Sequence, residues 1–190
     1  MVSTGGPMAR PSARPQLIEA ALRVVEAGGI TALTLDAVVE EAGMTKRGLI
    51  YHFPNKHALL VGIHEELADR IERALLDATG RDPEGASLVD RTKGYVLASL
   101  RSLTHVEMPF ILEAANDPEW MAPWLRVYRR WFPEGEQPVE DMDDQSLRCL
   151  VARMAADGLW GYESTLASPL TSEARERLAA SILDVLGEDA

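Results

Sequence analysis

The side chains best suited to chemistry in this sequence are basic and aromatic groups gathered between residues 45 and 56. They are Lys46, Arg47, Gly48, Tyr51, His52 and Lys56. Lys46 and Arg47 at the start of a short helix suit the reading of base edges in the major groove, and Gly48 lets a backbone approach closely. On their own, Lys46 and Arg47 also fit an ordinary solvated helix face. The pattern favours a DNA contact surface.

Signals for catalysis are poor elsewhere in the chain. The four histidines (His52, His57, His64 and His105) lack HExxH or comparable metal-binding spacing. No GxSxG, Walker or Rossmann glycine pattern occurs. Cys149 is the single cysteine, which excludes an intrachain disulfide and a cysteine metal cluster. We therefore expect no enzymatic activity, no metal and no cofactor.

The elements that position the basic cluster are predicted to be helices. Apolar residues recur at helical spacing along nearly the whole chain, and no convincing strand alternation occurs. Residues 133–144 are acidic and contain two prolines, which predicts an exposed loop. The sequence predicts an all-α protein of about nine helices, near residues 14–27, 34–42, 45–52, 55–78, 85–104, 106–115, 118–132, 143–166 and 172–186.

Two of these helices are short and adjacent, as in a helix-turn-helix. Thr34 and Thr45 are suitable N-caps, and Gly43 permits the tight turn between the helices. The apolar residues expected to face inward are Leu35, Val38, Val39, Leu49 and Phe53. Asn55 is a suitable cap for the next helix, whose free N–H groups, with Lys56, suit a phosphate. His52 and Lys56 also fit ordinary surface roles.

The run that begins at Thr34, TLDAVVEEAGMTKRGLIYHFPNKHALL, resembles the signature of the tetracycline-repressor (TetR) family. The similarity extends from Gln16 to Leu60. Its matching residues are Thr34, Gly43, Thr45, Gly48, Tyr51, His52, Phe53 and Lys56. The stretch Asp157-Gly158-Leu159-Trp160 is similar to the penultimate helix of that family. Ile50 departs from the pattern, because the family usually has there a tyrosine that contacts the DNA backbone; Tyr51 follows and is the expected substitute.

The resemblance implies a homodimeric repressor that binds a palindromic double-stranded DNA operator and is released by a small-molecule effector. The implied DNA contacts are Thr34, Thr45, Lys46, Arg47, Gly48, Tyr51, His52 and Lys56. We expect a flexible tail over residues 1–12, a helix-turn-helix domain over 13–56, and a helical effector-binding and dimerisation domain over 57–190. Two half-sites are expected because one short helix reads few bases.

The last two predicted helices are the expected dimer interface, forming a four-helix bundle with their copies. The expected interface residues are Leu147, Leu150, Val151, Met154, Gly158, Gly161, Leu178, Ile182 and Val185. Gly158 and Gly161 allow close approach of helices. In the alternative interpretation, these apolar stripes face only the core of their own protomer.

Aromatic residues and methionines are concentrated in the middle helices, where they fit a pocket for an apolar or aromatic effector. The predicted lining residues are His105, Met108, Phe110, Glu113, Trp124, Tyr128, Trp131, Met154 and Trp160. Met121 belongs to the same group, and Cys149 is a further reactive side chain near it. An ordinary helical core contains the same residue types.

The net charge of −11 argues against DNA binding until it is divided by region. Residues 1–56 hold six basic and five acidic side chains, whereas residues 57–190 hold 13 basic and 25 acidic ones. The acidity thus belongs to the C-terminal part. With no secretory signal and no membrane-length apolar run, we expect a cytoplasmic protein. The other hypothesis from the sequence is a helical small-molecule sensing module with weak or no specific DNA binding.

Overall fold

The computed structural model describes residues 13–102, 106–165 and 170–187. Over these residues the chain forms nine α-helices and four short 3-10 helices, and no strand. The prediction of an all-α fold is confirmed, and the helix bounds agree with the predicted ranges within a few residues. The chain divides into two compact units, Met1–Gly62 and Ile63–Ala190, with the boundary inside helix α4 (Lys56–Thr79).

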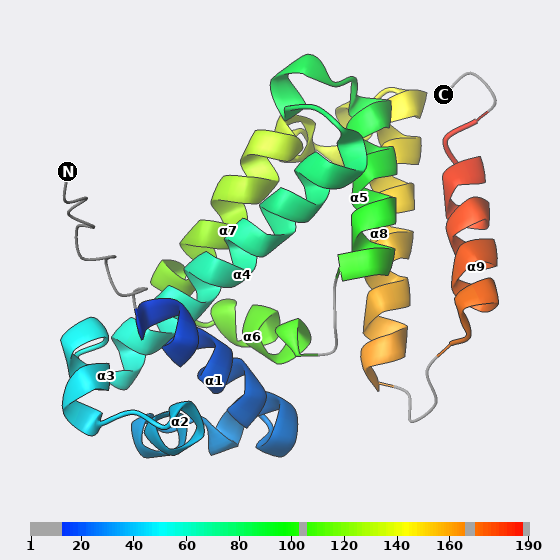
Figure 1. The fold of residues 1–190 in the computed structure, drawn as a ribbon. Coiled ribbons are helices and arrows are strands. Elements are labelled where there is room, and N and C mark those ends of the chain that lie inside the picture. The colour runs from blue at the N-terminus through cyan, green and yellow to red at the C-terminus, as the bar shows by residue number, and fades with distance from the viewer. Residues whose placement is uncertain (1–12, 103–105, 166–169, 188–190) are drawn as a thin grey trace, which may run out of the picture. The chain divides into compact units, whose positions relative to one another are not determined.

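The N-terminal unit contains α1 (Ala13–Gly28), η1 (Ile30–Ala32), α2 (Leu35–Ala42), α3 (Lys46–His52) and the first turns of α4 (Figure 1). Helix α1 buries Leu17, Ala21 and Val25 at helical spacing. Leu33, Val38, Leu49 and Phe53 complete this core, each at most 2% exposed. Since α2 and α3 are only two turns long, this core is what keeps them folded.

Glycine at position 62 allows α4 to pass close to the ring of Phe53. A Cβ atom on Gly62 would lie 2.6 Å from Cε1 of Phe53, closer than atoms can approach. The guanidinium of Arg14 lies 5.4 Å from the centroid of the same ring. Phe53 is also the C-cap of α3, so these contacts fix where α3 ends.

The C-terminal unit contains the rest of α4 and five further helices, joined in part by short 3-10 helices. The helices are α5 (Leu88–Ser102), α6 (Glu107–Ala114), α7 (Pro118–Trp131), α8 (Asp144–Thr165) and α9 (Ser172–Asp184). The 3-10 helices are η2 (Pro83–Gly85), η3 (Pro133–Glu136) and η4 (Val139–Asp141). The predicted loop over 133–144 therefore contains two short helical turns, and most of its residues are exposed.

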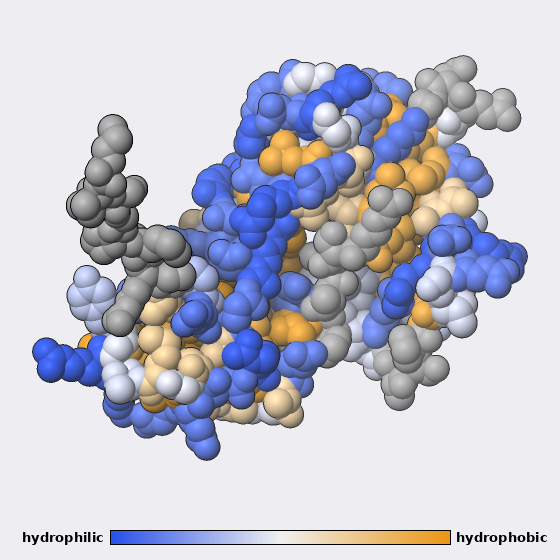
Figure 2. Space-filling view, in the orientation of Figure 1, coloured by the Kyte–Doolittle hydropathy of each residue, from blue (hydrophilic) through white to orange (hydrophobic). Residues whose placement is uncertain are grey.

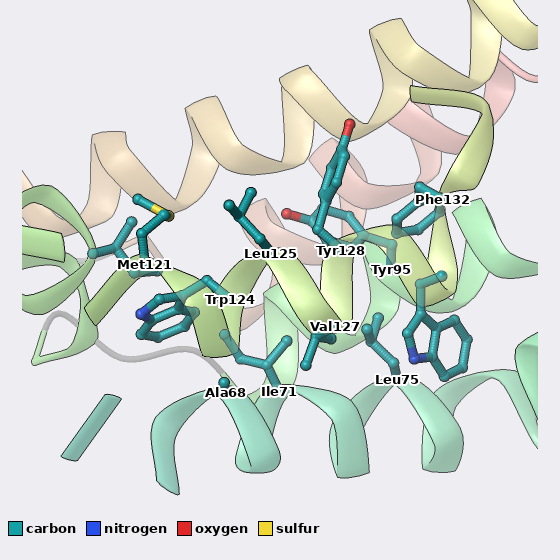
Figure 3. A pocket seen from close by; sticks show the side chains of 12 residues that line it. Ala68, Ile71, Leu75, Tyr95, Met121, Trp124, Leu125, Val127, Tyr128 and Phe132 are labelled. Atoms are coloured by element: carbon teal, nitrogen blue, oxygen red, sulfur yellow. The ribbon is translucent and has the colours of Figure 1, made fainter. Parts of the chain in front are cut away.

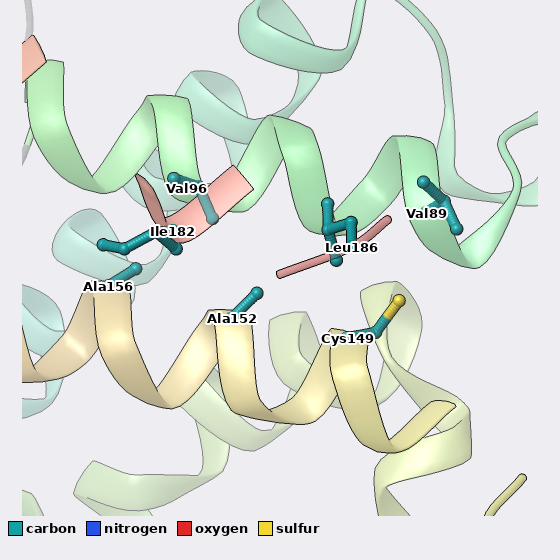
Figure 4. Packing of buried hydrophobic residues seen from close by; sticks show 7 residues of the cluster. All are labelled: Val89, Val96, Cys149, Ala152, Ala156, Ile182 and Leu186. Atoms are coloured by element: carbon teal, nitrogen blue, oxygen red, sulfur yellow. The ribbon is translucent and has the colours of Figure 1, made fainter. Parts of the chain in front are cut away.

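Two apolar clusters hold this unit together. The first joins α5 to α8 and α9 through small side chains, with Cys149, Ala152 and Ala156 packed against Val89, Val96, Ile182 and Leu186 (Figure 4). The second joins α4, α5 and α7 through Ala68, Leu75, Ala98, Val127, Trp131 and Phe132. The second cluster borders the apolar cavity described below.

A buried arginine secures the chain where α7 ends. Arg91 is 7% exposed, and its Nη1 donates to the carbonyl oxygen of Trp131 while Nη2 pairs with Glu134 at 2.6 Å. A buried cation is stable when it is both paired and hydrogen-bonded in this way. Hydrophilic residues cover much of the face in Figure 2, including most of α9, and apolar residues reach the surface chiefly over α5 and the adjoining part of α8. Among the described helices, none has the length and apolar character that crossing a membrane requires.

Candidate nucleic-acid interface and ligand cavity

The turn between α2 and α3 is fixed by its own backbone chemistry. Gly43 adopts a left-handed conformation with φ 62°, and its N–H bonds the carbonyl of Glu40 at 3.1 Å. The next amide, of Met44, donates to the carbonyl of Val39 at 3.1 Å. The hydroxyl of Thr45 then accepts from the amide of Gly48 at 3.1 Å, which caps α3. Helix α3 therefore starts at a defined place and angle relative to α2.

The predicted basic residues lie on the outward surface of α3. Lys46, Arg47 and Tyr51 are exposed, and Tyr51 is 84% exposed. His52 is half-buried, with its ring edge-on to Tyr51 at 5.0 Å between centroids. Ile50 is 44% exposed and adds an apolar side chain to this surface. Since Leu49 is fully buried, the helix has a clear inner and outer side.

One of these cations already has a partner. Nζ of Lys46 lies 2.7 Å from Oδ1 of Asp36 in the first turn of α2. Both side chains are mostly exposed, so the pair contributes little to stability. The pair affects the position of the Lys46 side chain, because the Asp36 carboxylate draws its ammonium group toward α2.

Two capping residues flank this surface. The Thr34 hydroxyl accepts from the amide of Ala37 at 3.1 Å, at the start of α2. Oδ1 of Asn55 accepts from the amide of Ala58 at 2.8 Å, and exposed Lys56 is the first residue of α4. The N-terminus of α4 thus offers amide groups beside a lysine, which suits an anion.

The C-terminal unit encloses a cavity of about 220 Å³ bordered by α4, α5, α6 and α7 (Figure 3). Its lining is almost wholly apolar and aromatic: Ala68, Ile71, Leu75, Tyr95, Ile111, Met121, Trp124, Leu125, Val127, Tyr128, Trp131 and Phe132. A smaller space of about 50 Å³ shares Ile71, Leu75, Tyr95 and Ile111 with it and reaches Trp160. Such a cavity fits a small apolar ligand.

The predicted ligand residues divide into three groups. Trp124, Tyr128 and Trp131 line the main cavity, and Trp160 lines the smaller one. Phe110 is buried against His64, while Met108, Glu113 and Met154 line neither space, and Met154 is 64% exposed. His105 lies outside the described residues, as does the predicted tail over 1–12. Cys149 is buried in the α5–α8–α9 cluster, where burial raises the pKa of its thiol.

Several lining residues were not identified from the sequence, above all Tyr95 on α5 and the α4 residues Ile71 and Leu75. Their only signal is apolar helical spacing, which does not tell which neighbouring helix a residue faces. His64 was noted only as one of four histidines. It is fully buried, 3.1 Å from Nε1 of Trp124 and stacked on Trp120 at 5.7 Å between ring centroids. Burial lowers the pKa of His64 to about 4, against an opposing effect of Asp117.

Helix α8 presents one exposed apolar stripe. Leu147, Val151, Met154 and Tyr162 are each 40–64% exposed and repeat at intervals that place them on one side of the helix. Gly158 lies on the same side with no atom within 4 Å of the position of a Cβ, whereas Gly161 faces the methyl of Met108. Leu178 on α9 is 40% exposed, Leu150 and Val185 are half-buried, and Ile182 is buried in the protomer's own core.

Among the described residues, no three His, Cys, Asp or Glu side chains are placed to hold a metal ion. The polar side chains of the two candidate sites include those of Lys46, Arg47, Lys56, Tyr95 and Tyr128. That inventory suits binding of nucleic acid and of a small ligand.

Both units match known family models. Residues 17–63 match the model for bacterial regulatory proteins of the tetR family, and residues 89–187 match the model for tetracyclin repressor-like C-terminal domains. A search of curated proteins finds no match.

Solved structures share the fold at low sequence identity. A proposed transcriptional regulator from Saccharomonospora viridis, in complex with choline, is 17% identical with TM-score 0.68 over 95% of this chain and 98% of its own. One from Pseudomonas aeruginosa PAO1 is 18% identical with TM-score 0.66 over 94% and 92%. A proposed TetR-family regulator from Rhodococcus sp. is 20% identical with TM-score 0.64 over 92% and 98%.

Proposed function

Because the chain belongs to the tetracycline-repressor (TetR) family of bacterial regulatory proteins, which are ligand-responsive DNA-binding regulators, we propose how this member works. It is a repressor that binds a palindromic operator as a homodimer through α3 and is released when a small effector occupies the α4–α7 cavity. Family members are generally regulators and not enzymes.

The observation that carries the DNA-binding part is the outward surface of α3. Its N-terminus is fixed by the Thr45 cap, and both basic residues of its first turn are exposed, Lys46 as the partner of Asp36 and Arg47 beside it. A short helix of this kind reads bases with the residues of its N-terminal turn. Thr34, Lys56 and the α4 N-terminus are suited to the flanking phosphates.

Ile50 and Tyr51 divide a role that one tyrosine usually has in the family. Ile50 has no donor for a phosphate, but it offers an apolar side chain of the kind that contacts a thymine methyl. Tyr51 is 84% exposed, so its hydroxyl is free to reach a phosphate oxygen. We assign the backbone contact to Tyr51.

The dimer is supported by the stripe on α8. Leu147, Val151 and Met154 are exposed apolar side chains on the side of α8 opposite its buried small residues. Contiguous exposed apolar surface of this kind favours burial in an interface. Leu178 on α9 adds to it, and Gly158 leaves space for a second helix.

The effector site is supported by the cavity. Its size and its apolar, aromatic lining suit a small organic molecule, and it lies entirely in the C-terminal unit. The regulator from Saccharomonospora viridis holds choline, which shows that a protein of this fold accommodates a small ligand.

A DNA-binding titration tests the proposal. Sites would be selected from randomised DNA, compared with DNA upstream of the protein's own gene, and measured by fluorescence polarisation over a salt series. We expect a palindromic site whose affinity falls steeply with salt, because phosphate contacts release counterions. Failure to select any site at low salt would contradict the repressor function and leave a ligand-sensing module.

A further inference from the structure

The polar atoms around the cavity that have no partner are hydrogen-bond donors. Nε1 of Trp131 is buried and has no hydrogen-bond partner among the described residues, although Trp131 lines the cavity and is fully buried. On α8, Nε and Nη1 of Arg153 are buried and also lack partners. A buried donor without an acceptor is costly, and a buried charge without a counter-ion is more so.

Arg153 is placed directly behind the aromatic wall of the cavity. The side chain is 6% exposed, and its guanidinium carbon lies 4.1 Å from the ring centroid of Phe132 and 5.4 Å from that of Tyr128. Both rings line the cavity. In Figure 3 the Tyr128 ring extends from α7 toward α8, the helix that carries Arg153. The electric field of the Arg153 guanidinium therefore acts on a ligand in the cavity.

Two carboxylates in this part of the C-terminal unit are hydrogen-bonded to other groups. Asp157 accepts a hydrogen bond from the hydroxyl of Tyr95 at 2.5 Å. Glu134 is paired with Arg91 at 2.6 Å. Neither forms an ion pair with Arg153. The Asp157 carboxylate does interact with the Arg153 charge, although burial has the larger effect and raises the pKa of Asp157. The guanidinium is therefore only partly compensated.

The same geometry disfavours a cationic ligand. Aromatic rings attract cations through their faces. Here Arg153 already lies over Tyr128 and Phe132, so a second cation in the cavity would meet its repulsion. An anion with an apolar body would instead be attracted by Arg153 and would offer oxygens to the Trp131 indole.

From these observations we propose that the effector is a carboxylate with an apolar body about the size of one or two aromatic rings, and that Arg153 selects its negative charge. This inference rests on the effector site of the proposed function and adds the charge of the ligand to it. Tyr128, at 39% exposed, is the least buried of the rings around Arg153 and marks the side from which the carboxylate approaches.

Matched ligand triads test the inference. Each triad carries a carboxylate, a neutral amide and an ammonium on the same phenyl, indolyl or naphthyl body, and binding to the full-length protein is measured by calorimetry at pH 7.5. We expect the carboxylate to bind about tenfold or more tightly than its amide, as for a charge-assisted hydrogen bond, and the ammonium to bind most weakly. An amide or ammonium that equals or exceeds its carboxylate overturns the inference.

Variants on α8 show whether Arg153 is the source of the preference. Arg153→Met is expected to lose the preference for the carboxylate while keeping amide binding, and Arg153→Lys to retain most of it. Arg148→Met, at an exposed position of the same helix, is the control and should match the wild type. Should Arg153→Met not fold, the wild-type comparison within each triad decides alone.

Operator binding, measured on the same protein preparations, distinguishes a failure of the proposed repressor function from a failure of the inference about the charge of the effector. If the amides bind the protein and release it from DNA as well as the carboxylates do, the repressor function stands and the charge inference fails. If no member of any triad binds, the cavity fails as an effector site, and the inference fails with it.

Discussion

Nε1 of Trp124 donates a hydrogen bond to Nδ1 of His64 at 3.1 Å, across the C-terminal unit between α7 and α4. The bond requires His64 to be unprotonated at Nδ1, so the neutral imidazole carries its proton on Nε2. Trp124 lines the cavity, and His64 is enclosed by Phe110, Trp120 and Trp124. A neutral histidine thereby fixes the position of a cavity wall.

The free energy of unfolding should therefore decrease as the pH is lowered from 6.5 to 4. The pKa of His64 is lowered from 6.5 to about 4 by burial, so between these values the unfolded chain binds a proton that the folded chain does not. The contribution of neutral His64 to the free energy of unfolding is fully present above pH 6.5 and decreases toward pH 4, by at most about 3 kcal/mol. Urea unfolding of wild type and His64→Phe across this range measures the difference. A His64→Phe variant with the same pH dependence as the wild type would contradict the prediction.

Substitutions on α3 should separate base reading from phosphate binding. If each side chain reads a base as proposed, we expect Lys46→Ala and Arg47→Ala each to weaken operator binding by ~1–3 kcal/mol more than binding to random DNA. Polarisation titrations on both DNAs give this comparison, with exposed Arg177→Ala as the control. Equal losses on the two DNAs would identify a phosphate contact instead.

Removing the partner of Lys46 should strengthen DNA binding. Asp36→Asn frees the ammonium that lies 2.7 Å from the carboxylate and removes a negative charge beside the DNA surface. Because exposed ion pairs are weak, the expected gain is about 0.5–1 kcal/mol. Glu41→Gln on the same helix removes the same charge but frees Arg23, so it serves as the matched control. Equal gains in DNA affinity for the two variants would show that the loss of one negative charge, and not the release of Lys46, strengthens binding.

A charge on the α8 stripe should dissociate the dimer. Met154→Asp introduces a carboxylate at an apolar side chain that is 64% exposed in the protomer, and an interface would have to bury that charge. Light scattering at micromolar concentration should then give the monomer mass. Leu112→Asp, at a leucine on α6 that is 66% exposed, makes the same kind of change elsewhere and should leave the dimer intact. A monomeric wild type would refute the proposed assembly.

The helix-turn-helix was predictable because its determinants are local. Thr34, Gly43 and Thr45 act within three residues of their own positions, through caps and a left-handed turn. The sequence also indicated that aromatic residues are concentrated in the middle helices, and three of them, Trp124, Tyr128 and Trp131, line the cavity.

Packing partners were harder to predict. On α8 the larger apolar residues Leu147 and Met154 are exposed, while Ala152 and Ala156 are buried because small side chains allow α5 and α9 to approach closely. Helical spacing identified the face that carries Leu147 and Met154, but it could not tell whether that face meets a second copy or the protomer's own core. Likewise Tyr95 and Arg153 belong to the cavity region only because α5 and α8 pack beside α7.

The burial of Cys149 has a practical consequence for measurements on the proposed dimer. It is the only cysteine of the sequence, it is 1% exposed, and burial raises the pKa of its thiol. Thiol-reactive spin labels will therefore leave it unmodified and attach only to an introduced surface cysteine, such as one at exposed Glu40 on α2. Pulsed dipolar spectroscopy on such a protein would report the separation of the two α2 helices with and without effector, in an otherwise native background.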